Sequence, residues 1–183
     1  MEWYALFVKT GKEDYICNDL KKIFDYNNVK IRLLVPKRKL MEYHSGVKEY
    51  VEKPLFPGYI LFETCSVEQI YYIIKNTQNR YIYSVLRTHA YFQKVNPKEI
   101  ETILALINSC GVIEKSLVFV ENDRIRIKEG PLTNYTGVIE KICPRKKRAK
   151  IRLKFLDRIC HLDICVECIE TIDKQEIKNT IVF

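Results

Sequence analysis

Several features that mark common protein classes are missing or scarce in this sequence. No uncharged stretch approaches the roughly 18 to 20 apolar residues that a membrane span requires. Residues 1–4 have neither the basic region nor the apolar run of a signal peptide. The six glycines are scattered singly, so no glycine-rich loop is available to hold phosphates. These absences predict a cytoplasmic protein that contacts no membrane and carries no cofactor.

Histidine is also rare, and the cysteines do not form a recognisable set. His44, His89 and His161 are dispersed, and none lies in a base-orienting motif, so we expect a protein that is not an enzyme. Seven cysteines without an export signal favour reduced thiols over disulfides. Cys165 and Cys168 have zinc-ligand spacing, but on a strand they point to opposite faces, and no second such pair exists. Small thiols that fill a core are therefore favoured over a metal site.

The composition is that of a soluble globular protein, and its charge is unevenly distributed. A chain of 183 residues that is 47% apolar and 30% charged suits one medium domain or two small ones. Residues 124–158 hold 12 lysines and arginines against 3 acidic residues, although the whole chain carries a net charge of only +8. This basic segment suggests a nucleic-acid partner, while basic surfaces also occur without any ligand.

The first 110 residues alternate strand and helix patterns. Strand character appears near residues 3–8, 29–35, 59–62 and 81–86, and helical periodicity follows residues 12, 66 and 96. Asn96 followed by Pro97 is a strong helix start, and Ser66 with Gln69 is a second one. Residues 37–43 and 47–52 flank a turn at Gly46 and predict a protruding hairpin. This order predicts an α/β sandwich, with a four-stranded, mainly antiparallel sheet, three helices and a hairpin insertion.

The pattern changes after residue 110. Residues 111–120 are expected to be a linker, and no helical period follows them. Ile151, Leu153 and Phe155 alternate with cationic residues, as in a half-buried strand with one basic face. Residues 121–183 therefore predict a small five-stranded β-barrel with a C-terminal tail, which makes the whole chain a two-domain α+β protein. Whether the two domains pack together is left open by the sequence.

Four features, in their order along the chain, carry a family resemblance. They are Trp3–Leu6 at the N-terminus, Pro54–Tyr59 in mid-chain, the helix-bearing first domain, and Gly130–Ile139 at the opening of the barrel. Together they resemble the NusG family of transcription factors over essentially the whole chain. The resemblance implies an N-terminal domain that binds RNA polymerase and a C-terminal KOW barrel that binds other partners.

The basic tract at residues 144–150 and the hairpin insertion are similar to specialised paralogs of the LoaP antiterminator type. For such a paralog the resemblance implies recruitment at a leader-encoded RNA signal and read-through of terminators, by a protein expected to be a monomer. Two alternatives remain. One is a housekeeping NusG whose barrel binds a ribosomal or termination-factor protein, and the other is a ribosome-associated KOW protein.

The resemblance also implies a polymerase-binding surface, an apolar cavity that docks the tip of the clamp helices. Aromatic side chains suit this contact because they bury a large area at modest conformational cost. Alternatively, the side chains at the candidate positions only fill the core. Because side chains alternate along a strand, about half of those on one strand must be buried in any case. A second polymerase contact known in relatives has no evident counterpart here, and Tyr71 and Tyr72 in the corresponding stretch are expected to be ordinary helix-surface residues. The matching positions are Tyr4, Phe7, Phe56, Pro57, Tyr59 and Leu61.

Cations at the predicted barrel turn and on the following strand suggest one continuous RNA-binding patch. An RNA stem offers phosphates and a shallow minor groove, and unpaired loop bases can stack on an aromatic ring. A solvated turn, or loose affinity for any nucleic acid, is the alternative. The candidate RNA-binding residues are Arg145, Lys146, Lys147, Arg148, Lys150, Arg152, Lys154 and Tyr135.

A second cationic group lies at the base of the predicted hairpin. Lys37, Arg38 and Lys39 are candidates for contact with non-template DNA, the upstream duplex or the same RNA hairpin. Acidic residues nearby partly cancel their field, so a plain surface hairpin is an equal alternative.

Overall fold

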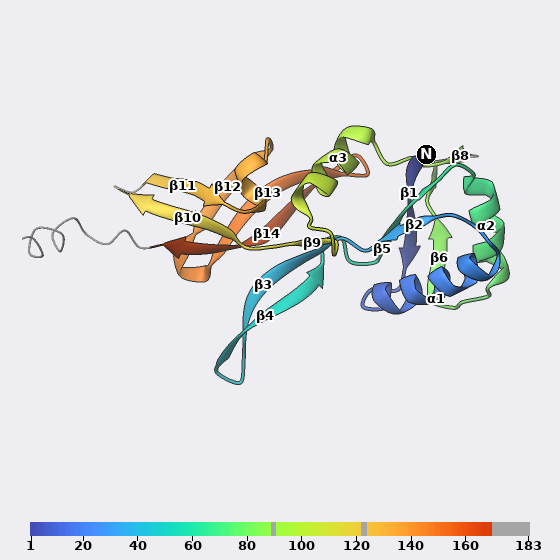
Figure 1. Ribbon diagram of the computed structural model, residues 1–183, viewed down its shortest axis with the longest axis horizontal. Coiled ribbons are helices and arrows are strands. Elements are labelled where there is room, and N and C mark those ends of the chain that lie inside the picture. The colour runs from blue at the N-terminus through green and yellow to red at the C-terminus, as the bar shows by residue number, and fades with distance from the viewer. Residues whose placement is uncertain (89–90, 122–123, 170–183) are drawn as a thin grey trace, which may run out of the picture.

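The computed structural model describes residues 1–88, 91–121 and 124–169 and confirms the predicted two-domain α+β fold (Figure 1). The first domain contains a sheet with the strand order β2-β5-β1-β6, in which all neighbours are antiparallel. Its strands are β1 (Glu2–Val8), β2 (Arg32–Leu34), β5 (Tyr59–Thr64) and β6 (Ile82–Val85). Its helices are α1 (Glu13–Tyr26), α2 (Val67–Asn76) and α3 (Pro97–Leu106).

This sheet is covered on both faces. Ile60 and Phe62 of β5 pack with α1 and α2 on one face. Leu61 points the other way, into a cluster that contains α3 and residues of the second domain. The uninterrupted apolar run of β5 is therefore explained by burial on both sides.

Two helices begin at the residues that the sequence predicts. The Asn96 side chain accepts a hydrogen bond of 3.0 Å from the backbone N–H of Lys98, which confirms the predicted cap of α3. Ser66 occupies the cap position of α2, but its side chain makes no capping bond. Instead, Thr64 Oγ1 accepts a 3.1 Å bond from the Ser66 N–H. The pattern of Ser66 and Gln69 therefore predicted the residue at which α2 begins. It did not predict that the Ser66 side chain leaves the N–H groups of the first helical turn without a cap.

The predicted hairpin consists of β3 (Lys37–His44) and β4 (Val47–Pro54), and its tip projects away from both domains (Figure 1). Ser45 and Gly46 both have positive φ angles, 50° and 84°, as a tight two-residue hairpin turn requires. The base of β3 pairs in parallel with β9 (Val112–Ile113). The stretch expected to be a linker, residues 111–120, therefore contributes to sheets, and Val112, Ile113 and Ser116 within it are buried.

The second domain is a curled sheet of five strands in the order β11-β10-β14-β13-β12, and we refer to this domain as the barrel. Along β13, inward and outward side chains alternate as predicted, with Ala149, Ile151, Leu153 and Phe155 buried. The domain contains β10 (Ser116–Glu121), β11 (Arg124–Glu129), η1 (Pro131–Asn134), β12 (Val138–Cys143), η2 (Pro144–Lys146), β13 (Arg148–Phe155) and β14 (Arg158–Ile169).

Two short strands, β7 (Arg87–Thr88) and β8 (Tyr91–Phe92), form a separate ladder beside the first domain. Within the described residues, no helix combines the length and the apolar character needed to cross a membrane. The predicted C-terminal tail from residue 170 onward lies outside the described residues.

Candidate protein and nucleic-acid interfaces

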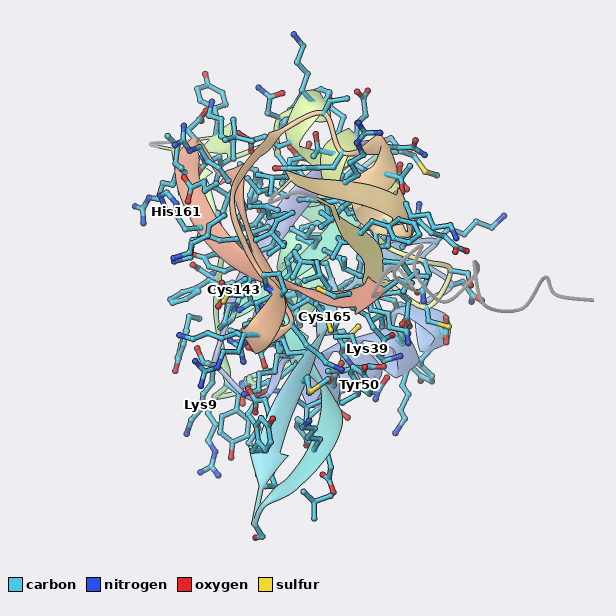
Figure 2. The ribbon with its side chains drawn as sticks, turned by 90° about the vertical axis from the view of Figure 1, so that its left-hand side faces the viewer. Lys9, Lys39, Tyr50, Cys143, His161 and Cys165 are labelled. Atoms are coloured by element: carbon cyan, nitrogen blue, oxygen red, sulfur yellow. The ribbon has the colours of Figure 1, made fainter. Side chains whose placement is uncertain are left out.

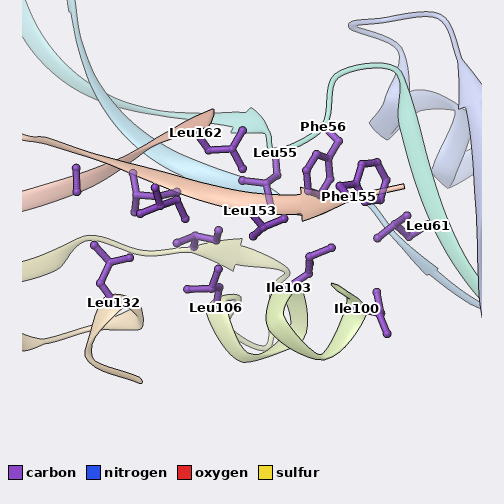
Figure 3. Packing of buried hydrophobic residues seen from close by; sticks show 14 of the residues in the cluster. Leu55, Phe56, Leu61, Ile100, Ile103, Leu106, Leu132, Leu153, Phe155 and Leu162 are labelled. Carbon is purple, nitrogen blue, oxygen red and sulfur yellow. The ribbon is translucent and has the colours of Figure 1, made fainter. Parts of the chain in front are cut away.

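The candidate polymerase-binding side chains of the 54–61 segment lie against the barrel. The rings of Phe56 and Phe155 stack with their centroids 3.8 Å apart, and the Tyr59 ring meets Phe155 edge-on at 5.6 Å. Leu61 lies in the same cluster, next to Ile100 and Ile103 of α3 (Figure 3). The two domains thus share one apolar core, and the end of β13 covers part of the candidate surface.

A shallow groove of about 410 Å³ remains open beside this contact. It is lined from the first domain by Phe56, Pro57 and Tyr59 and from the barrel by Leu156 and Cys160, among others. Pro57 is exposed, whereas only 5% of Phe56 is accessible. The groove is therefore the part of the candidate surface that a partner can reach while the domains stay packed.

The turn before β5 is held in place from α1. The carboxylate of Glu13, at the first residue of α1, is buried and accepts a 2.7 Å hydrogen bond from the backbone N–H of Gly58. Gly58 has a φ of 86°, a left-handed conformation that glycine adopts without a steric penalty. Glu13 therefore holds in place the turn that carries Phe56 and Pro57.

Replacing Glu13 by alanine is expected to lower the free energy of unfolding by about 2 kcal/mol, because the Gly58 N–H is left buried without an acceptor. Glu13→Gln keeps an acceptor oxygen and is the matched control, with an expected loss below about 1 kcal/mol. Urea denaturation of both variants measures the difference. Equal stability of the alanine and glutamine variants would contradict this role.

Tyr4 and Phe7 lie apart from the Phe56 cluster. Tyr4 is buried on the α1 and α2 side of the sheet, where its ring stacks on Phe62 at 5.6 Å. Burial, with a hydrogen bond to Glu2, raises the pKa of Tyr4 to about 12. Phe7 is 37% exposed and its ring lies 5.4 Å from that of Tyr59. Phe7 thus extends the candidate surface, whereas Tyr4 is a core residue.

A buried carboxylate on α3 contacts the end of the barrel. Glu99 is only 5% exposed, and its Oε2 accepts a 2.9 Å hydrogen bond from the backbone N–H of Leu156. Its Oε1 lies 3.7 Å from Lys154 Nζ. In the local sequence, Glu99 is only an acidic residue in the first turn of α3. Its contact with the barrel depends on tertiary packing, which no local pattern indicates.

The three cations at the base of the hairpin are engaged inside the molecule. Arg38 Nη1 donates a 3.0 Å hydrogen bond to the backbone carbonyl of Asp163 in β14, and burial lowers the pKa of Arg38. Lys37 pairs with Asp14 at 3.0 Å, and Lys39 pairs with Glu114 at 2.8 Å. These residues connect the hairpin to α1, β9 and the barrel.

The predicted basic patch divides into two groups. Arg145, Lys146, Lys147, Arg148 and Lys150 line one wall of a cleft between the barrel and the β3–β4 hairpin. Figure 2 shows the turn that follows Cys143 directly beside the hairpin. The other candidates lie toward α3, in a separate depression that contains Tyr135, Arg152 and Lys154.

The second group, Tyr135, Arg152 and Lys154, makes ion pairs and hydrogen bonds within the protein. Arg152 Nη2 pairs with Glu140 at 2.9 Å, and Lys154 pairs with Asp157 at 2.8 Å as well as lying near Glu99. The Tyr135 hydroxyl donates a hydrogen bond to the carbonyl of Arg152, and burial raises the pKa of Tyr135. Tyr135 is thus held against the barrel, on a different face from the basic turn.

Comparisons with known proteins identify the family of this chain. The family described as "Transcription termination factor nusG" matches residues 1–104, which is more than half of the chain. The chain belongs to the NusG family.

Relatives within the NusG family cover nearly the whole chain. "Transcription termination/antitermination protein NusG" of Halalkalibacterium halodurans is 25% identical over 162 residues, which are 85% of this chain and 90% of that protein. The protein with the same description from Staphylococcus carnosus is 24% identical over 173 residues, 92% and 94% of the two chains. A solved structure described as "Domain interaction in Thermotoga maritima NusG" has a TM-score of 0.57 at 21% identity and covers 90% of this chain and 93% of that one. The similarity to this structure shows a common fold.

Three cysteines of the barrel in this NusG-family chain lie at apolar positions, whereas Cys65 and Cys110 are exposed. Cys165 is fully buried, and Cys160 and Cys168 are partly buried against the shared core. Burial raises the pKa of all three thiols, which keeps them protonated at neutral pH. Among the described residues, no three histidine, cysteine or acidic side chains are grouped closely enough to hold a metal ion.

Proposed function

We propose that this protein is a transcription elongation and antitermination factor that binds rather than catalyses. The first domain binds the clamp helices of RNA polymerase, and the basic turn of the barrel binds an RNA hairpin in a leader transcript. The bound factor then travels with polymerase and suppresses termination, as expected for a specialised paralog of the LoaP type. The observation that carries this proposal is the cluster of cations on the turn from Arg145 to Lys150.

Membership of the NusG family supports the polymerase contact, and the aromatic side chains of residues 56–59 supply the surface for it. Large aromatic rings next to an open groove are suited to docking a helical tip. Phe155 occupies part of that surface, so full engagement of polymerase requires the barrel to move away from the first domain. The factor would therefore be closed when free and open when bound.

The charge on the basic turn supports the RNA contact. Arg145, Lys146 and Lys150 are exposed, and none of them has an ion-pair partner among the described residues. Cations that are not neutralised internally can each replace counterions on a phosphate, and the binding that results weakens as salt rises. A turn that served only for solubility would not require this many cations in one place.

Alanine at Arg145, Lys146 and Lys150 together is expected to weaken binding to a recognised RNA hairpin by about tenfold or more. The slope of log affinity against log salt is expected to fall by about 2 to 3, one phosphate contact for each cation removed. Fluorescence anisotropy with a panel of RNA hairpins and a scrambled single strand, over a salt series, measures both quantities.

The matched control carries alanine at Lys21, Lys22 and Lys75, which are exposed on α1 and α2. This control loses the same three positive charges as the variant at Arg145, Lys146 and Lys150, and it is expected to bind the RNA hairpin with the affinity of the parent protein. Equal, weak binding of every nucleic acid by all three proteins would contradict the RNA proposal.

Exposed apolar side chains on the barrel favour a second candidate function, in which the barrel binds a protein. Val138 and Ile159 are 49% and 60% exposed, and apolar residues on a barrel surface suit a protein partner. In that case the chain is a housekeeping NusG whose barrel binds a ribosomal or termination-factor protein. Affinity purification from cells separates the options. Polymerase without ribosomal subunits supports an elongation factor, and ribosomal subunits without polymerase support a ribosome-associated KOW protein.

A further inference from the structure

The cleft between the β3–β4 hairpin and the barrel has a volume of about 1,100 Å³, and its two walls come from different domains. Tyr43 and Lys48 are among the residues on the hairpin side. Lys141 and the basic turn, residues 145–150, line the barrel side. We call this feature the hairpin–barrel cleft. Neither its aromatic side chain nor its hairpin lysine was singled out by the sequence.

The base of the cleft is held together by contacts between the hairpin and the barrel. Asp163 of β14 joins the two walls, because its carbonyl oxygen accepts a hydrogen bond from Arg38 at 3.0 Å and its carboxylate binds Arg148 at 3.2 Å. The β3 strand is also tied to β9 by parallel pairing, and Lys39 forms an ion pair with Glu114, the residue that follows β9. The hairpin is therefore anchored to the barrel at its base, while residues 43–48 at its tip extend beyond these contacts.

The charge inside the hairpin–barrel cleft is strongly positive. Seven lysine and arginine side chains and only two carboxylates line it. Both carboxylates are already paired, Glu42 with Lys53 at 2.6 Å and Asp163 with Arg148. The cations without an ion-pair partner among the described residues are Lys48, Lys141, Arg145, Lys146 and Lys150.

An aromatic ring faces these cations. Tyr43 is 66% exposed, and its direct cross-strand partner is Lys48, whose Nζ lies 5.7 Å from the centre of the ring. Bases stack on exposed aromatic rings, while phosphates bind lysine and arginine. A double-stranded stem has its bases paired and stacked inside, so it offers no free base face to Tyr43. An unpaired strand offers both bases and phosphates.

We propose that the hairpin–barrel cleft holds an unpaired RNA segment, with a base stacked on Tyr43 and the flanking phosphates on Lys48 and the basic turn. This inference rests on the proposed RNA-binding function and specifies how it is carried out. The barrel alone provides charge, and the hairpin inserted in the first domain provides the stacking surface. Because both domains line the cleft, RNA binds the closed factor in the packed arrangement seen here, before the barrel moves away from Phe56 and admits polymerase.

The test uses the full-length chain with a short single-stranded oligouridine and a blunt RNA duplex of the same length as probes. Tyr43→Ala is expected to weaken binding of the single strand by about tenfold and to leave the salt slope unchanged, because stacking involves no counterion release. Lys146→Ala is expected to lower that slope by about 0.7. Binding of the duplex is expected to be insensitive to Tyr43→Ala.

Two controls make the result specific. Tyr43→Phe keeps the ring and is expected to retain the affinity of the parent. Tyr50→Ala removes an exposed tyrosine of the same hairpin that does not line the hairpin–barrel cleft, and it is expected to have no effect. Circular dichroism and urea denaturation check that each variant is folded.

The outcomes separate this inference from the proposed function. If Lys146→Ala weakens RNA binding and Tyr43→Ala does not, the RNA function stands and the stacking role of the cleft is wrong. If Tyr43→Ala weakens duplex and single strand equally, the preference for an unpaired segment is wrong. If no variant changes the binding of any RNA, both proposals are wrong. Equal effects on a single-stranded DNA of the same length would overturn the assignment to RNA.

Discussion

Replacing Phe155 by alanine is expected to raise the affinity of the full chain for RNA polymerase by about tenfold or more. Phe155 is only 4% exposed, and its ring stacks on Phe56 and meets Tyr59 edge-on. Loss of a buried phenylalanine ring costs about 3 to 5 kcal/mol, and here much of that loss falls on the packing between the domains. When the packed state becomes less populated, the polymerase-binding state becomes more populated, and the apparent affinity rises in proportion.

Two variants test whether Phe155 acts as a cover. Phe56→Ala removes part of the surface itself and is expected to lower polymerase affinity, the opposite direction. Phe119→Ala makes the same substitution in β10 of the barrel, away from the interface, and is expected to leave affinity unchanged. Titration of purified polymerase measures affinity, and small-angle scattering measures domain separation. An unchanged or lowered affinity of Phe155→Ala, with the barrel still folded, would show that the barrel does not cover the polymerase site.

Replacing Gly130 by alanine is expected to destabilise the barrel by about 3 kcal/mol or more. Gly130 has φ 100° and ψ −175°, a backbone conformation that is essentially restricted to glycine. A Cβ atom at this position would lie 2.7 Å from both the carbonyl oxygen of Lys115 and the Cα of Ser116. Both of these atoms belong to the backbone, so the clash cannot be relieved by a side-chain rotation. Thermal unfolding followed by circular dichroism measures the loss.

Gly46→Ala is the matched control for Gly130→Ala. Gly46 also has a positive φ, 84°, but an added Cβ would meet no atom within 4 Å. Its expected cost is about 1 kcal/mol, from backbone strain alone. A loss at Gly130 no larger than the loss at Gly46 would show that β10 can move to accept the added methyl group. The Gly130 result also bears on function, because the barrel contributes most of the cations of the hairpin–barrel cleft.

Local patterns determined most of the fold. The alternation along residues 149–155, the Asn96–Pro97 helix start and the glycine turn between β3 and β4 are each produced by interactions within a few residues. Such interactions can be predicted from sequence because the partners are neighbours in the chain. The same holds for the opposite faces of β5, where strand geometry alone separates Tyr59 and Leu61 from Ile60 and Phe62.

The candidate sites depended much more on tertiary structure. The sequence identified the cations of residues 37–39 and 145–154 but gave no sign of which of them are already paired. Arg38 finds its acceptor in Asp163, 125 residues away. Lys154 is engaged by Glu99 of α3, whereas Lys150, on the same face of β13, stays free of ion pairs among the described residues. The sequence sets the number of cations. The fold decides which of them lack an ion-pair partner and can therefore bind a phosphate.

By itself, the sequence determined a NusG-like order of strands and helices, a basic barrel and an aromatic segment at residues 56–59. Only the tertiary structure decided that Phe155 covers that segment, that Tyr4 is a core residue, and that the hairpin and the basic turn face each other across one cleft. The physical reason is that packing between domains joins side chains far apart in the chain. The free energy of these contacts depends on shape and burial, which no short stretch of sequence encodes.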